Sequence, residues 1–287
     1  MRRIWLCADD YGMAGAINVA IRDLVVRGRL NATSAMVAAA SCHRAEAVSL
    51  AVLNSAAPSV AIGLHVTLTA PFPPLSRQFT PVRDGAFMPL AATVRHALLR
   101  RFERDALASE IASQVERFSQ LFGRAPDFID GHQHVHLLPQ IRDAVLQVAK
   151  DIVPNAWVRQ CGRAIPLPAR LADTKGFFLD LLSRGFCQRA AAFGLRTNPA
   201  FAGTYDFADD ADFPALFPRF LDGLPDGGLV MCHPGFVDAE LQRLDPLTTL
   251  REWEYAYFAS DEFPAVLAAH RVTLASTAYS MISSARC

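Results

Sequence analysis

The sequence has no excess of either charge, because its 28 Lys and Arg residues equal its 28 Asp and Glu residues. It contains no basic stripe with interleaved aromatic residues, which argues against nucleic acid as the main partner. No apolar run reaches the roughly 18 residues of a membrane span. The apolar run after Arg2 and Arg3 is too short for a secretory signal peptide. We therefore expect no nucleic-acid partner, no transmembrane segment and a cytoplasmic location.

Several motifs are also missing. The six cysteines have no CxxC or zinc-finger spacing, and most lie in apolar segments, which indicates buried thiols in a reducing compartment. No GxGxxG or Walker sequence occurs, so the usual phosphate loop of a doubly wound sheet is absent. What the sequence does have is 52% hydrophobic residues over 287 positions. This content indicates a well-filled core in one large α/β domain or two smaller ones.

Apolar strand-like segments alternate with segments of helical periodicity, which indicates a largely parallel sheet. The predicted strands are 4–8, 33–39, 59–68, 128–132, 156–159, 199–206, 229–233 and 272–276. The predicted helices are about 17–25, 43–53, 90–99, 106–122, 140–150, 169–193 (with a break near 185), 213–221, 247–257 and 263–269. No repeat or low-complexity linker divides the chain, so we expect a single domain over residues 1–287.

Polar residues end several predicted strands, as in a (β/α) barrel whose active site gathers at the C-terminal strand ends. These residues are Asp9, Asp10, His65, His132, Arg159 and His233. The predicted fold is therefore a single-domain (β/α) barrel-like fold with a mostly parallel sheet, and a doubly wound open sheet is the alternative. A proline-rich segment at about 70–89 has no clear periodicity and is long enough to be a functional loop or lid.

The segment DFIDGHQHVHLLP, at 127–139, concentrates ionisable residues within an apolar run. Asp130, His132, His134 and His136 occupy alternate positions, so in extended form they would line one face. Same-face neighbours lie roughly 6.5–7 Å apart, so two of these imidazoles could approach one metal only where the strand ends and the chain turns. Three histidines and an aspartate in seven residues favour a metal or catalytic site over a solvated strand end.

A hydrolase built around one metal needs three protein ligands and an open position for water. Asp9 and Asp10 are adjacent carboxylates, of which one can bind a metal and the other can handle a proton. His65 and His132, at the ends of two other strands, complete an Asp-His-His set. His233 ends a buried strand and fits a general acid, since the usual pKa of imidazole lies near neutrality.

Four short blocks, ADDYG (8–12), GLHVTLT (63–69), DGHQHVHLLP (130–139) and CHPGF (232–236), resemble the YdjC-like carbohydrate deacetylase family (ChbG/HpnK type). The blocks occur in the family's order. The resemblance implies a (β/α) barrel-like fold and a metal-dependent hydrolase that removes an N-acetyl group from an amino sugar and releases acetate. The substrate would be a chitooligosaccharide or a glycolipid head group.

Carried over position by position, the resemblance assigns one divalent metal ion to Asp10, His65 and His132. The expected ion is Zn or Mg, with Mn or Co as alternatives. Similarity to the wider polysaccharide deacetylases implies that Asp9 is the general base and His233 the general acid. Those wider relatives take both metal histidines from one HxxxH motif, which this sequence lacks.

Three further residues are predicted to bind substrate, namely Arg159, His134 and His136. Arg159 could instead orient Asp9 or form a surface salt bridge, and the two histidines could support the metal ligands. Two other functions stay open, namely another metal-dependent barrel hydrolase or isomerase and a catalytically silent sugar-binding protein. The few carboxylates at the strand ends weigh against a two-metal phosphoesterase. A homodimer is a further expectation, and the particular sugar is not readable from the sequence.

Overall fold

A computed structural model describes residues 1–54, 60–165, 173–208 and 211–276. Its main sheet has the strand order β7-β6-β3-β2-β1-β9-β8, and β10 pairs with the first residues of β1. Every pairing in this sheet is parallel. The strands are β1 (Arg2–Tyr11), β2 (Ala32–Ala35), β3 (Ala61–Val66), β6 (Phe128–Gly131), β7 (Trp157–Val158), β8 (Phe201–Ala202), β9 (Leu229–Cys232) and β10 (Val272–Leu274).

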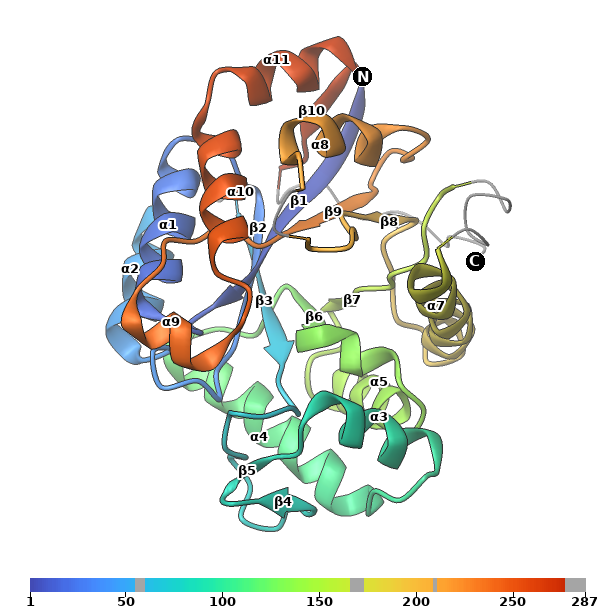
Figure 1. Cartoon of the computed structure of the whole chain (residues 1–287). Helices are drawn as coiled ribbons and strands as arrows, with labels where there is room; N and C mark the ends of the chain where they lie inside the picture. The colour runs from blue at the N-terminus through green and yellow to red at the C-terminus, as the bar shows by residue number, and fades with distance from the viewer. Residues whose placement is uncertain (55–59, 166–172, 209–210, 277–287) are drawn as a thin grey trace.

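The two edges of this sheet approach each other. Isolated parallel bridges join Val158 to Thr197 and Arg163 to Phe201, so the chain after β7 meets the segment around β8. The sheet is therefore curled like a barrel rather than open and flat, and Figure 1 shows it wrapping around its own interior. The prediction of a barrel-like, mostly parallel α/β fold is confirmed.

Helices cover the outside of the sheet (Figure 1). Their apolar faces supply the burial that stabilises them; in the first helix the predicted positions Ile17, Ile21 and Leu24 are fully buried. The helices are α1 (Gly15–Val26), α2 (Arg44–Leu53), α3 (Leu90–Leu98), α4 (Arg104–Phe122), α5 (Ile141–Ile152), α7 (Thr174–Ala192), α8 (Phe213–Leu221), α9 (Ala239–Leu244), α10 (Thr249–Ala259) and α11 (Glu262–Ala269), with a 3-10 helix η1 (His132–Leu137).

Strand β1 lies in the middle of the sheet and is buried from Ile4 to Tyr11. A strand buried on both faces has to be apolar along most of its length, as the run from Ile4 to Ala8 is. Asp9 and Asp10 interrupt this run, yet they are only 2% and 1% exposed. Buried carboxylates are costly unless they are paired, so the structure must supply positive partners or donors around them.

Several predicted boundaries differ from the structure. The strand predicted over 33–39 ends at Ala35, and the strand predicted over 199–206 is only Phe201–Ala202. At Gly203, with φ of 104°, a Cβ atom would lie 2.2 Å from the carbonyl oxygen of Met231. The chain therefore turns against β9 there instead of continuing as a strand.

The remaining differences concern α7 and the proline-rich segment. Helix α7 runs through Gly185 without the predicted break, and predicted helix positions 169–172 lie outside the described residues. The segment 70–89 contains a small antiparallel hairpin of β4 (Val82–Arg83) and β5 (Ala86–Phe87). It is thus partly ordered by its own hydrogen bonds.

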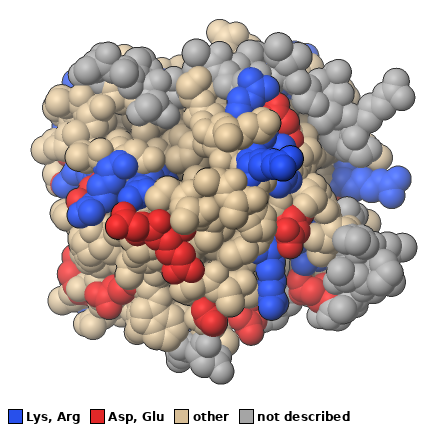
Figure 2. Space-filling model, turned by 90° about the horizontal axis from the view of Figure 1, so that it is seen from above, with Lys and Arg blue, Asp and Glu red and all other residues tan. Residues whose placement is uncertain are grey.

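None of the helices in the described part of the chain is long and apolar enough to cross a membrane. On the face seen in Figure 2, acidic and basic side chains of the described residues are interspersed among neutral ones. Most buried apolar side chains of the described residues form one continuous core cluster that includes residues of β1, α4, α5 and α8. This is compatible with a single domain over residues 1–287, which stays a prediction.

Candidate active site

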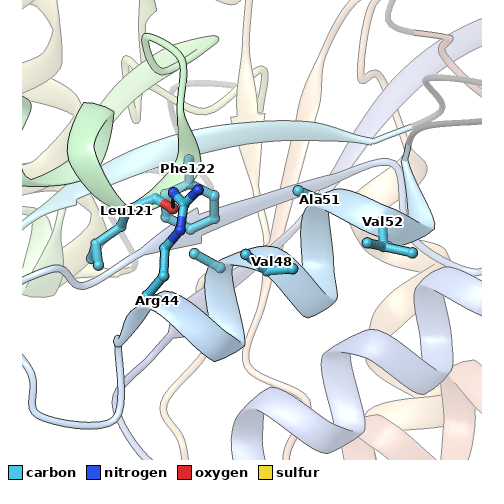
Figure 3. Close-up of a pocket in the computed structure, with 7 residues that line it drawn as sticks. Arg44, Val48, Ala51, Val52, Leu121 and Phe122 are labelled. Atoms are coloured by element: carbon cyan, nitrogen blue, oxygen red, sulfur yellow. Dashed lines mark hydrogen bonds between the residues drawn. The ribbon is translucent and has the colours of Figure 1, made fainter.

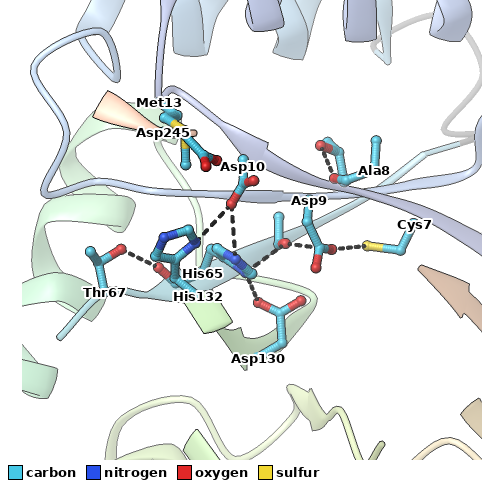
Figure 4. A network of polar contacts seen from close by, with 12 residues as sticks. Cys7, Ala8, Asp9, Asp10, Met13, His65, Thr67, Asp130, His132 and Asp245 are labelled. Atoms are coloured by element: carbon cyan, nitrogen blue, oxygen red, sulfur yellow. Dashed lines mark hydrogen bonds and ion pairs between the residues drawn. The ribbon is translucent and has the colours of Figure 1, made fainter. Parts of the chain in front are cut away.

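The C-terminal end of β1 brings two consecutive carboxylates into one polar network (Figure 4). In a regular strand, neighbouring side chains would point to opposite faces. The pairing of β1 with β2 shifts register between Ala8 and Tyr11, and Asp10 has a left-handed backbone with φ of 69°. Aspartate tolerates this conformation better than most residues. The local irregularity therefore lets Asp9 face Arg159 while Asp10 faces His65 and His132.

Asp10, His65 and His132 converge from three strand ends. The Oδ1 atom of Asp10 lies 3.0 Å from Nδ1 of His132 and 3.3 Å from Nε2 of His65. One ligand atom from each residue falls within 4.8 Å of the other two, and all three residues are buried. One carboxylate and two imidazoles are a donor set that suits zinc and its neighbours. The residues brought together here thus fit the expected metal.

The imidazole of His65 is oriented by two neighbours. Its Nδ1 donates to Oδ1 of Asp130 at 2.6 Å and lies 3.0 Å from the hydroxyl of Ser34. This contact leaves Nε2 directed toward Asp10, as a metal-binding histidine requires. Burial lowers the pKa of His65, but the Asp130 charge and the hydrogen bonds to Asp10 and Asp130 raise it to about 10. The site around His65 is therefore built to hold positive charge.

Arg159 joins the two remaining carboxylates. Its guanidinium donates to both oxygens of Asp9, at 2.9 and 2.8 Å, and also pairs with Asp130. Burial lowers the pKa of Arg159, but the charges of Asp130 and Asp9 outweigh this and keep the group cationic. Cys7, Asp9 and Asp130 also have a spacing that could hold a metal. Because the guanidinium already supplies their positive partner, we assign no ion to that group.

The side chain of Arg159 is 0% exposed. A surface salt bridge is thereby excluded, and direct contact with a sugar is disfavoured by burial. Of the roles predicted for this residue, the orientation of Asp9 is the one that the geometry supports. Two parallel hydrogen bonds fix the plane of the Asp9 carboxylate.

The HQHVH segment turns immediately after β6. Gln133 and His134 have left-handed backbones, with φ of 53° and 58°, so the alternate histidines do not continue along one extended face. Gly131 permits the tight turn because a Cβ atom there would lie 2.9 Å from Nδ1 of His136. His132 alone of the three histidines therefore reaches the metal-ligand set.

His136 and His134 lie outside the group of Asp10, His65 and His132; His136 is buried, whereas His134 is partly exposed. His136 is fully buried, and its Nε2 donates to the carbonyl oxygen of Arg159 at 2.8 Å. Burial and the Arg159 charge lower its pKa to about 3, and those same two causes also hold the pKa of His134 well below its usual value. His134 contacts Cys161 and stacks edge-on against Phe201. Burial disfavours substrate contact by His136, which instead anchors the backbone that carries Arg159.

His233 follows β9 and belongs to the same strand-end face. Its ring packs edge-on against Phe207, 5.5 Å between centroids, and its backbone N–H donates to Glu254. Burial lowers the pKa of His233 to about 4; the charge of Asp10 opposes this shift, and that of Arg251 adds to it. The imidazole is therefore mainly neutral at neutral pH.

Two buried residues of α10 are functional candidates that the sequence analysis missed. Arg251 donates to Oδ2 of Asp10 at 2.7 Å, and Glu254 accepts from His233 and, at 2.7 Å, from the hydroxyl of Tyr205. Both are 1% exposed. The sequence does contain a signal for these two residues. Arg251 and Glu254 are three positions apart, so they lie on one face of the helix, and that face also carries apolar Leu250 and Phe258.

A separate groove of about 260 Å³ lies between α2 and the end of α4 (Figure 3). It is lined mainly by apolar side chains, among them Val48, Val52 and Phe122, with Arg44 at one end. Arg44 donates to the carbonyl oxygens of Gln120 and Leu121, so its guanidinium caps the C-terminal end of α4. The groove offers no acid, base or metal ligand, and we do not assign it to the site.

Fold and site together define a class: a barrel-like α/β protein with one candidate metal centre beside a carboxylate–arginine pair. Within that class the chain matches the model of the YdjC-like protein family over residues 3–269, and it belongs to this family. It is 31% identical over 259 residues to a chitooligosaccharide deacetylase of Klebsiella pneumoniae, covering 85% of this chain and 88% of the relative.

A solved structure supports the same fold. A crystal structure from Enterococcus faecalis, of a protein assigned to cellobiose-phosphate cleavage, is similar with a TM-score of 0.75. The similarity covers 96% of this chain and 97% of the other at 21% identity. At that identity the likeness concerns the fold.

Proposed function

We propose that this protein is a metal-dependent deacetylase that removes the N-acetyl group from an amino sugar and releases acetate. The observation that carries the proposal is the convergence of Asp10, His65 and His132 beside Asp9, a carboxylate that Arg159 holds in place. The name of the Klebsiella relative, a chitooligosaccharide deacetylase, supports the reaction and the substrate class.

Oδ1 of Asp10, Nε2 of His65 and Nδ1 of His132 would hold one divalent ion. When bound, such an ion polarises the acetyl carbonyl and makes a water molecule more acidic. Two imidazoles favour Zn, Mn or Co over Mg, which prefers an all-oxygen environment. Of the two ions expected from the sequence, zinc therefore fits this donor set better than magnesium.

Asp9 is the proposed general base. Arg159 holds its carboxylate through two hydrogen bonds, at 2.9 and 2.8 Å. The hydroxyl of Ser34 lies 3.3 Å from Oδ1 of Asp9 and 3.0 Å from Nδ1 of His65, so Asp9 adjoins the proposed metal ligands. An ionised, oriented carboxylate can take the proton of the attacking water as the bond to the acetyl carbon forms.

His233 is the proposed general acid for the departing amine. With a pKa of about 4, only about one free molecule in 10³ carries the protonated ring at pH 7. The nearby charges of Asp9 and Asp10 favour the protonated form, and the ring must gain its proton before the carbon–nitrogen bond breaks.

The proline-rich segment borders the site and is proposed to select the sugar. The ring of Phe72 packs edge-on against His132, 5.9 Å between centroids. Buried Glu110 of α4 accepts hydrogen bonds from the backbone of Leu75 and Ser76, at 3.2 and 2.7 Å. The segment is thereby tied to the body of the protein close to a metal ligand. Cytoplasmic location and a homodimer stay predictions.

Acetate release from N-acetylglucosamine oligomers and from an N-acetylated glycolipid head group tests the proposal. The protein is stripped with a chelator and reloaded with Zn, Mn, Co or Mg in parallel. We expect acetate only after reloading. Acetate release that is indifferent to chelation would reject the metal, and sugar binding without acetate from any reloaded form would indicate a silent sugar-binding protein.

A further inference from the structure

The side chain of Arg251 enters the site from outside the barrel. It is one of the largest fully buried side chains, and it extends from α10 to the end of β1. Its backbone oxygen also accepts from Gly235 at 3.0 Å, in the loop that carries His233. A buried guanidinium that merely filled space would be costly, so its partners identify its role.

Arg251 contacts only one of the two carboxylate oxygens of Asp10. Its Nη2 donates to Oδ2 of Asp10 at 2.7 Å and to Asp245, and its Nε donates to the carbonyl oxygen of Leu247 at 3.0 Å. Oδ1 of Asp10 faces His65 and His132. One oxygen of this carboxylate is thus occupied by a guanidinium, and only the other is offered to the proposed metal site.

The contact of Arg251 with Oδ2 limits how Asp10 could coordinate a cation. A carboxylate free on both oxygens can bind a cation in a bidentate manner, and Asp245, which meets the same guanidinium, could approach as a further oxygen ligand. More oxygen donors favour cations of high coordination number, such as Mn²⁺ and Mg²⁺, over four-coordinate Zn²⁺. The guanidinium excludes both additional donors.

We propose that Arg251 is a positioning residue that restricts Asp10 to one coordinating oxygen and thereby sets the metal preference of the site toward zinc. The inference rests on the proposed function, because it takes the three-residue metal site as given. It concerns selectivity rather than affinity. Removing a positive charge should strengthen the binding of every divalent ion to a similar degree, whereas the ratio of two dissociation constants reports the ligand arrangement.

The test uses Arg251→Met and Arg251→Gln, with dissociation constants for Zn²⁺ and Mn²⁺ measured by chelator competition. We expect the preference for Zn²⁺ over Mn²⁺ to fall by about tenfold or more in Arg251→Met, as for other residues that orient metal ligands. Arg251→Gln, which retains one donor, should give an intermediate ratio. The visible absorption of the Co²⁺-loaded protein should weaken in Arg251→Met as its coordination number rises.

Arg163→Met is the matched control. Arg163 is also nearly buried and pairs with Asp180 at 2.9 Å, but it lies after β7 at the edge of the sheet. Its loss should leave the Zn²⁺/Mn²⁺ ratio unchanged. A second variant, Asp245→Asn, keeps the contact between Arg251 and Asp10 and should also keep the wild-type ratio, even if Arg251→Met fails to fold.

The outcomes separate the two proposals. If the wild-type protein binds no divalent ion, the proposed metal site itself is wrong. If the wild type binds Zn²⁺ but both Arg251 variants keep its ratio and its Co²⁺ spectrum, Arg251 is a structural residue only. A changed ratio in Asp245→Asn or in the control would likewise overturn the inference, because neither substitution frees the second oxygen of Asp10.

Discussion

Replacing Arg159 with methionine should destabilise the protein strongly. The guanidinium is the common partner of Asp9 and Asp130, and all three side chains are almost completely buried. Removing one partner of a buried ion pair costs about 3–5 kcal/mol because it leaves an uncompensated charge. At about 2 °C per kcal/mol for a chain of this size, Tm should fall by roughly 6–10 °C.

Thermal unfolding followed by circular dichroism measures the loss of Tm. The double variant Arg159→Met/Asp130→Asn is the control, since it removes one of the two unpaired charges and should recover part of the lost Tm. A loss of stability below about 1 kcal/mol would refute the argument that buried charge explains the arrangement.

Four other results are expected. Asp9→Asn should keep fold and metal but lose roughly 10²–10⁴-fold in activity, as for a general base; loss of the metal would show that the adjacent aspartates have opposite roles. Metal analysis of His65→Ala or His132→Ala should show strongly reduced occupancy, and wild-type occupancy in both would reject the site. His233→Ala should slow deacetylation of an N-acetyl sugar by about 10²-fold but hydrolysis of nitrophenyl acetate much less, because nitrophenolate leaves without a proton; equal losses would argue against an acid. Burial raises the pKa of Glu254 to about 7. Ionisation of this carboxyl therefore lowers the stability of the wild type as the pH rises from 5 to 8. Glu254→Gln should gain about 2.5 kcal/mol of stability relative to the wild type over that range, measured by urea titration at both pH values.

Much of the fold could be predicted because its signals are local. Alternating apolar strands and amphipathic helices follow from periodicity, and Gly123 ends α4 with φ of 72° as its position indicates. The lengths of β2 and β8 could not be predicted in this way. Where β8 stops depends on the close approach of Gly203 to Met231, and that contact joins residues far apart in the sequence.

The candidate site, like the fold, could be predicted only where its signals are local in the sequence. Motif spacing selected the residues that converge, namely Asp10, His65 and His132, because each stands at the end of a strand. It did not reveal that Arg159 is buried between two carboxylates, or that Arg251 reaches Asp10 from a helix 241 positions later in the chain. Such partners are fixed by tertiary packing. The local signal of Arg251 is a charged residue on an apolar helix face, and that of Arg159 is a charged residue at the end of a predicted strand.

The succession of Asp9 and Asp10 along β1 has a consequence for how the enzyme could be altered. Consecutive Cα atoms are about 3.8 Å apart whatever the rest of the molecule does, so the proposed base and its neighbouring metal ligand form a unit of fixed size. His233 follows another strand, β9, and its backbone N–H donates a hydrogen bond to Glu254 of α10. Changes in the packing of α10 can therefore shift His233, the proposed acid, to suit different leaving groups. The spacing between Asp9 and Asp10 would stay the same.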